Sequence, residues 1–80
     1  MPNKLKVFSG ADVVKIFNHF GFQTISQKGS HIKLRRLKAD GVKQIIIIPN
    51  HDELDKGTLK AIYNKAVSFI PEDELKDYFR

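Results

Sequence analysis

The chain has 80 residues and no cysteine, so it makes one small domain that no disulfide or thiolate–metal site can stabilise. No apolar run approaches the roughly 20 residues of a membrane span, and no long apolar stretch follows the basic N-terminus, so we expect a soluble, cytoplasmic protein. The net charge of +5, from 14 Lys and Arg against nine Asp and Glu, suits an anionic partner.

The first predicted element is a helix from about Gly10 to Phe20. Ser9 is its expected N-cap, and the acidic Asp12 three residues later fits a variant of the capping box. Three apolar residues recur at helical spacing and predict one buried face: Val13, Phe17 and Phe20. Gly21 then offers the left-handed stop that is common just past a helix end.

Two strands are predicted next, joined by a tight turn at Gly29-Ser30. The segment from Phe22 to Lys28 alternates only weakly, whereas the segment from His31 to Leu37 alternates clearly. Ile32 and Leu34 of the second strand point to one face, which we assign to the core. The opposite face is therefore open and carries one histidine and two cations: His31, Lys33 and Arg35.

A third strand is predicted from Ile45 to Ile48. The turn before it, Lys38 to Gly41, contains the Asp-Gly pair typical of a hairpin, and Pro49 ends the strand. All four residues are isoleucine, so both faces of this strand are apolar. We expect either another segment of the chain or a partner to cover the second face.

A second helix is predicted to begin near Lys56, with Asp55 as N-cap, and to end at Pro71. Its apolar stripe is Leu59, Ile62, Tyr63, Ala66, Val67 and Ile70. The element order is α-β-β-β-α, an α+β fold with two helices on one face of a three-stranded antiparallel sheet. We expect one domain over residues 1–80, with a core over about 9–70 and a short acidic tail over 71–80.

The acidic tail, from Glu72 to Phe79, allows two interpretations. It can compete with an anionic ligand for the basic face, or it can solvate the end of the chain. The second is the simpler expectation.

The positive charge is concentrated in the first 48 residues. They hold nine basic and two acidic residues, whereas residues 49–80 hold five basic and seven acidic ones. Such a concentration is expected for a surface that meets phosphates. The alternative is a solvated, lysine-rich surface without a ligand.

Of the three histidines, His31 is the best candidate for chemistry. His19 lies beside the apolar stripe of the first helix, where we expect a surface or packing role, and His51 lies in a loop that it can cap or orient. The three are too scattered to imply a metal site, and there is no Gly-rich phosphate loop. The sequence predicts no metal or cofactor.

Cleavage of the RNA backbone fits a histidine among cations. The ribose 2′-hydroxyl can serve as the internal nucleophile, so the protein need only move protons and stabilise charge. Cations close to His31 favour its neutral, basic form by like-charge repulsion, and they also offset the charge that builds on the phosphorane. A second candidate phosphate contact is the helix start formed by Lys56, Gly57 and Thr58, unless it is an ordinary helix start.

Four motifs in order and spacing resemble the HicA family of toxin mRNA interferases, also called YcfA-like. They are SGADVVKIFNHFGF at Ser9–Phe22, KGSH at Lys28–His31, PNH at Pro49–His51 and KGTLKAI at Lys56–Ile62. Together they span nearly the whole chain, from Ser9 to about Ile70. The sequence departs from the family after KGSH, where an aromatic or second histidine is frequent, and at the end of the second helix.

The resemblance implies a fold similar to double-stranded RNA-binding domains and a metal-independent ribonuclease that cleaves mRNA. The essential histidine of the family is then His31, with Gly29 and Ser30 shaping its approach. Four cations are expected to hold RNA phosphates: Lys28, Lys33, Arg35 and Lys56. A HicB antitoxin is the implied partner, and the apolar outer face from Ile45 to Ile48 is where we expect it to dock.

Two other functions remain open from the residues alone. A non-catalytic RNA-binding module would use the same fold and charge to bind A-form RNA by shape. A partner-binding domain would use the charge only for solubility. Salt dependence separates this last function from the other two, because phosphate contacts weaken steeply as salt rises. Only cleavage separates a ribonuclease from an RNA-binding module.

Overall fold

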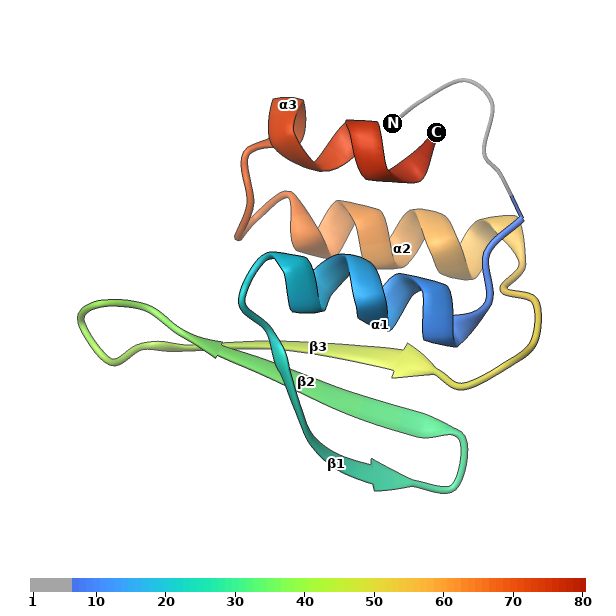
Figure 1. The fold of residues 1–80 in the computed structure, drawn as a ribbon, viewed down its shortest axis with the longest axis horizontal. Helices are drawn as coiled ribbons and strands as arrows, with labels where there is room; N and C mark the ends of the chain where they lie inside the picture. Colours follow the sequence, from blue (N-terminus) through green and yellow to red (C-terminus); the bar gives the residue numbers. More distant parts are fainter. Residues whose placement is uncertain (1–6) are drawn as a thin grey trace.

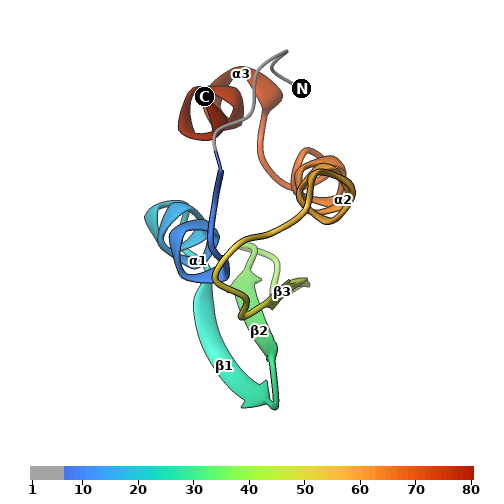
Figure 2. The ribbon, with the colours of Figure 1, turned by 90° about the vertical axis from the view of Figure 1, so that its right-hand side faces the viewer.

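The computed structural model describes residues 7–80. Its elements are α1 (Gly10–His19), β1 (Gln23–Lys28), β2 (His31–Leu37), β3 (Lys43–Pro49), α2 (Lys56–Ala66), α3 (Glu72–Leu75) and the 3-10 helix η1 (Lys76–Phe79) (Figure 1). The strands form one antiparallel sheet in the order β1-β2-β3. Helices α1 and α2 lie on the same side of this sheet, which confirms the predicted α+β architecture (Figure 2).

Helix α1 begins with the predicted capping box. The Ser9 amide donates to the Asp12 carboxylate at 3.0 Å, and the Asp12 amide donates to the Ser9 hydroxyl at 3.0 Å. The bond from the Ser9 amide holds the pKa of Asp12 below its ordinary value. At the other end of α1, Gly21 has a φ of 92°, which confirms the predicted left-handed stop.

The strands extend differently from the prediction at two points. Strand β1 begins at Gln23 because Phe22 is buried in the core, and the strand contains a bulge between Thr24 and Ser26. Strand β3 begins at Lys43, two residues before the predicted start, because its pairing with β2 continues to the end of the hairpin. Both differences lengthen or shift an edge strand and leave the bounds and the alternation of β2 as predicted.

The core lies between the sheet and the helices. Strands β2 and β3 contribute alternate residues, α1 and α2 contribute one face each, and the largest fully buried side chains are Tyr63, Phe17, Phe22 and Phe79. Strand β1 contributes none, since all six of its residues are exposed. The sheet is therefore anchored through β2 and β3, while β1 stands out from the core.

The C-terminal segment is part of the core, so the expectation of a solvating tail is wrong. Leu75 and Phe79 are fully buried, although the four acidic side chains of the segment are exposed: Glu72, Asp73, Glu74 and Asp77. The Phe79 ring lies 5.5 Å from that of Phe8 and 5.3 Å from that of Tyr63. The segment is amphipathic, and its apolar positions close the side of the helical layer that faces away from the sheet (Figure 1).

Helix α2 ends at Ala66, earlier than the predicted end at Pro71. The chain turns through Val67 to Ile70, with the amides of Phe69 and Ile70 donating to the Ala66 carbonyl at 2.9 and 2.8 Å. This turn directs the C-terminal segment back over the helices. Over residues 7–80, none of the helices is long and apolar enough to cross a membrane.

Candidate active site

The open face of the sheet is the face that points away from α1 and α2. Antiparallel pairing aligns its side chains in three rows across the strands: Lys28–His31–Pro49, Ser26–Lys33–Ile47 and Gln23–Arg35–Ile45. Residues two apart on β2 and β3 share this face, and the bulge in β1 brings Gln23 and Ser26, three residues apart, onto it. The prediction that His31, Lys33 and Arg35 share the open face is confirmed.

His31 lies in a shallow hollow of this face. The hollow has a volume of about 210 Å³ and is lined by Ser26, Lys28, His31, Lys33 and Ile47. His31 is exposed, with Lys28 opposite it on β1 and Lys33 two residues further along β2. Arg35 is half-buried one row further along and does not line the hollow. The sequence analysis did not identify Ser26 or Ile47, which the pairing register places beside Lys33.

The turn before His31 depends on glycine for its conformation. Gly29 has a φ of 56°, and a side chain there would meet nothing within 4 Å, so conformation rather than space is what requires glycine. The Gln27 side-chain amide donates to the Gly29 carbonyl at 3.2 Å. The Asn50 amide donates to the Ser30 carbonyl at 2.5 Å, which ties this turn to the loop after β3.

The loop after β3 is in turn held by the start of α1. The Gly10 amide donates to the His51 carbonyl at 2.8 Å, and a Cβ on Gly10 would overlap the Pro49 carbonyl oxygen. Pro49 is the β3 partner of His31. The start of α1 at Ser9 and Gly10 therefore holds the loop that follows the β3 partner of His31. His51 takes part through its backbone carbonyl, and its side chain is exposed.

Arg36, one of the nine basic residues in the first 48, has a structural role. Arg36 points to the core side of β2, and its guanidinium donates to the Phe20 carbonyl at 2.9 Å and to the Phe69 carbonyl at 2.8 Å. It also donates to the Gln44 side chain at 2.7 Å and lies 4.9 Å from the centre of the Phe22 ring. The alternation of β2 could have identified this role, since Arg36 follows Leu34 by two residues.

The family of the protein follows from a comparison with known sequences. The profile of the HicA toxins of bacterial toxin–antitoxin systems matches residues 10–67. The chain belongs to the HicA toxin family. The match includes the hollow around His31 and all of α2, and it leaves out α3 and η1. A search of individually curated proteins gives no significant match.

As a HicA-family toxin, the protein is one component of a toxin–antitoxin system, and its family implies an antitoxin partner.

The open-face cations are free to meet a ligand. Within residues 7–80, Lys28, Lys33 and Arg35 form no ion pair. The charge on this face of the toxin is therefore not neutralised by its own carboxylates.

The start of α2, the second candidate phosphate contact, already carries an anion. The Thr58 amide donates to the Asp55 carboxylate at 2.7 Å, and this bond lowers the pKa of Asp55. A phosphate at Gly57 or Thr58 would have to compete with that charge. Lys56 is exposed, but it does not line the hollow around His31.

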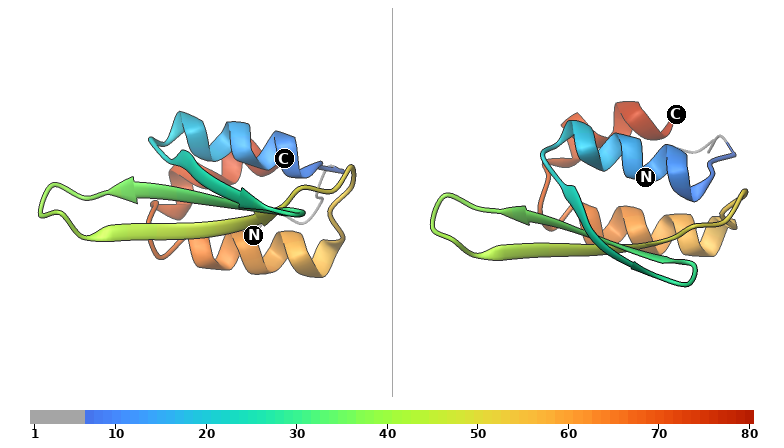
Figure 3. Two further views of the ribbon diagram at one scale, coloured as in Figure 1. Left: turned by 90° about the horizontal axis from the view of Figure 1, so that it is seen from below. Right: turned by 60° about the horizontal axis from the view of Figure 1, so that its bottom comes forward.

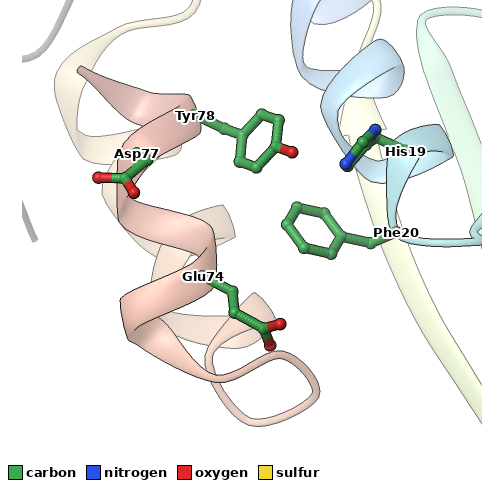
Figure 4. A pocket seen from close by; sticks show the side chains of 5 residues that line it. All are labelled: His19, Phe20, Glu74, Asp77 and Tyr78. Atoms are coloured by element: carbon green, nitrogen blue, oxygen red, sulfur yellow. The ribbon is translucent and has the colours of Figure 1, made fainter.

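His19 has the packing role that the sequence suggests. Its ring lies 5.4 Å from that of Phe20 and 4.9 Å from that of Tyr78, at the C-terminal end of α1 (Figure 4). The cleft beside these rings is also lined by the carboxylates Glu74 and Asp77. An acidic cleft repels phosphate, so His19 and His31 lie in opposite electrostatic surroundings.

The acidic side chains and histidines of the described chain do not gather at one point. In residues 7–80, no three of His, Asp and Glu lie close enough together to hold a metal ion. The groups available at the His31 hollow are thus an imidazole, two ammonium groups and the Ser26 hydroxyl.

Proposed function

We propose that this toxin is a metal-independent ribonuclease that cleaves mRNA with His31 as its acid–base residue. The observation that carries the proposal is the composition of the hollow, where an exposed imidazole lies with Lys28 and Lys33 and no carboxylate. Such a site attracts a phosphodiester and offers it one group that can transfer a proton near neutral pH.

The proposed reaction uses the RNA as its own nucleophile. His31 removes the proton of a ribose 2′-hydroxyl, and the 2′-oxygen forms a bond to the adjacent phosphorus. The bond from phosphorus to the 5′-oxygen of the next nucleotide breaks, and that oxygen takes a proton from the histidine or from water. The products are a 2′,3′-cyclic phosphate and a 5′-hydroxyl. DNA, which lacks the nucleophile, is not a substrate.

The lysines of the hollow stabilise the charge of the reacting phosphate. Lys28 lies opposite His31 and Lys33 lies two residues along β2, so both ammonium groups can stabilise the oxygens on which negative charge develops in the hollow. Arg35, one row beyond Lys33, is proposed to hold the next phosphate along the strand. Lys56 stays a predicted outer contact, and Gly29 and Ser30 set the turn that positions His31.

Inhibition by a HicB-type antitoxin is the second part of the proposal. Ile47 is 52% exposed and shares the hollow with His31, and Ile45 lies in the next row of the same face. A partner that covers these isoleucines therefore also closes the site. A crystal structure of the complex in which Ile45 and Ile47 stay exposed would remove this part.

The decisive experiment is a cleavage assay in EDTA on a labelled mRNA, with a DNA strand of the same sequence as control. The wild-type toxin should cut only the RNA, and His31→Ala should lose roughly 10²–10⁴-fold in rate. Because His31 is exposed, the variant should keep its stability and its affinity for RNA. His51→Ala, a matched histidine variant outside the hollow, should cut at the wild-type rate.

Three other outcomes would contradict the proposal. Binding of RNA without cleavage under all conditions would make the toxin an RNA-binding module. Equal cleavage by wild type and His31→Ala would move the site away from the open face. Affinity for RNA that does not change with salt would exclude phosphate contacts altogether.

A further inference from the structure

The two edges of the sheet are built differently. The free edge of β1 is polar, carries Lys28 and contains a bulge, three features that prevent pairing with another chain. The free edge of β3 has none of these between Gln44 and Pro49, where four isoleucines follow one another. A flat, apolar edge of this kind pairs readily with a further strand.

Helix α2 turns this edge into a groove. Viewed along the sheet normal, α2 lies beyond β3, on the side away from β2 (Figure 3, left). The groove between the helix and the strand has a volume of about 450 Å³. It is lined by Ile45, Ile46 and Ile47 from β3 and by Ala61, Ile62 and Lys65 from α2. The helical layer is thus wide enough to cover a fourth strand that residues 7–80 do not supply.

We propose that an extended segment of the antitoxin adds to the edge of β3 as this fourth strand. The backbone of β3 would supply the hydrogen bonds, and alternate apolar side chains of the segment would enter the groove against Ala61 and Ile62. Lys65 in the groove wall and the exposed Lys43 at the start of β3 select a segment that carries carboxylates. The inference rests on the proposed function only in taking the antitoxin as the partner.

A second copy of the toxin fits this edge poorly. Antiparallel pairing of two β3 edges would put both α2 helices over the same seam, because each helix already extends beyond its own edge (Figure 3, left). Neighbouring strands are only about 4.8 Å apart, which leaves no room for two helices side by side above them. The two Lys65 side chains would also meet. An extended segment without a helix of its own avoids both the crowding of helices and the repulsion between lysines.

The test uses the full toxin and its purified antitoxin. Ala61→Trp fills the groove from an exposed position that is outside the proposed catalytic and RNA-binding residues. It should weaken antitoxin binding in calorimetry by about 100-fold, and it should leave RNA cleavage unchanged. Asn64→Trp, an exposed position on the same helix that does not line the groove, is the matched control and should bind like the wild type.

Amide hydrogen exchange, measured on the wild-type toxin with and without antitoxin, is a second test that needs no variant. Amides of residues 43–48 should exchange more slowly when the antitoxin is bound, and those of β1 should not change. Unchanged affinity of Ala61→Trp, or protection confined to the β1–β2 turn, would overturn the inference. A toxin dimer in sedimentation that Ala61→Trp dissociates would assign the edge to a second copy instead. If wild type binds the antitoxin through β3 but never cuts RNA, the proposed function fails and the strand addition stands.

Discussion

The two faces of β2 perform separate tasks, and two adjacent arginines show this most directly. Arg35 lies on the open face, without an ion pair in the described chain, two rows from His31. Arg36 lies on the core face, where its guanidinium joins the C-cap of α1 to the turn after α2 through the carbonyls of Phe20 and Phe69. Charge alone does not distinguish these residues. Strand alternation does, because it decides which guanidinium meets solvent and which meets backbone.

Exchanging each arginine for methionine should separate the two tasks. Arg36→Met leaves two carbonyls and Gln44 without their donor, so we expect a loss of roughly 2–3 kcal/mol in unfolding free energy. Arg35→Met should change stability by less than about 0.5 kcal/mol and should lower the salt slope of RNA binding by about one. Urea unfolding and RNA binding at several salt concentrations measure both effects. Equal stability losses would break the comparison.

Gly10 is the position at which the two tasks should not separate. A Cβ at this position would overlap the Pro49 carbonyl oxygen, so Gly10→Ala should force the start of α1 away from the loop after β3. We expect the unfolding free energy to fall by about 1–3 kcal/mol. Since Pro49 pairs with His31, RNA cleavage at a temperature where the variant is folded should also fall. Ala11→Gly, an exposed neighbour, is the control and should affect stability without affecting cleavage.

Of the changes at Arg36, Gly10 and Tyr63, Tyr63→Phe should have the smallest effect on stability, and it should leave cleavage unchanged. Tyr63 lies in the helical layer, and its hydroxyl donates to Glu72 at 2.9 Å, so Tyr63→Phe should lose about 1 kcal/mol and keep full RNA cleavage. Burial, together with this hydrogen bond, raises the pKa of Tyr63 to about 12. A slower rate of cleavage would show that the helical layer also shapes the site.

The raised pKa makes a separate contribution to the pH dependence of stability. In the unfolded chain the phenol has a pKa of about 10, so between pH 10 and 12 only the folded state keeps the proton. This contribution is complete below pH 10 and is lost as the pH rises towards 12. Thermal unfolding of wild type minus Tyr63→Phe, measured across pH 9–12, isolates it from the titration of the lysines.

Much of the fold could be predicted because its signals are local. The capping residues Ser9 and Asp12, the left-handed Gly21 and the alternation of β2 each act within a few residues. The C-terminal segment could not be predicted in the same way. Its acidic residues dominate the pattern, and only the tertiary contacts of Leu75 and Phe79 show that it belongs to the core.

The residues of the candidate site that lie on β2 could be predicted from the sequence, but those on the neighbouring strands could not. Alternation placed His31 and Lys33 together, but Ser26 and Ile47 enter the hollow through pairing with strands whose register one sequence does not specify. The bulge in β1 makes this register harder still to predict. The role of Gly10 depends on a contact with Pro49, which local pattern cannot reveal.

The packing of Phe79 against Phe8 also bears on how the toxin is made. These rings come from opposite ends of the described chain, and together with Leu75 they complete the core. During translation, the core therefore cannot close until the residues around Phe79 have left the ribosome. An interrupted synthesis yields a chain without a closed core. A chain that stops before Phe79 leaves the Phe8 and Tyr63 rings without this packing partner.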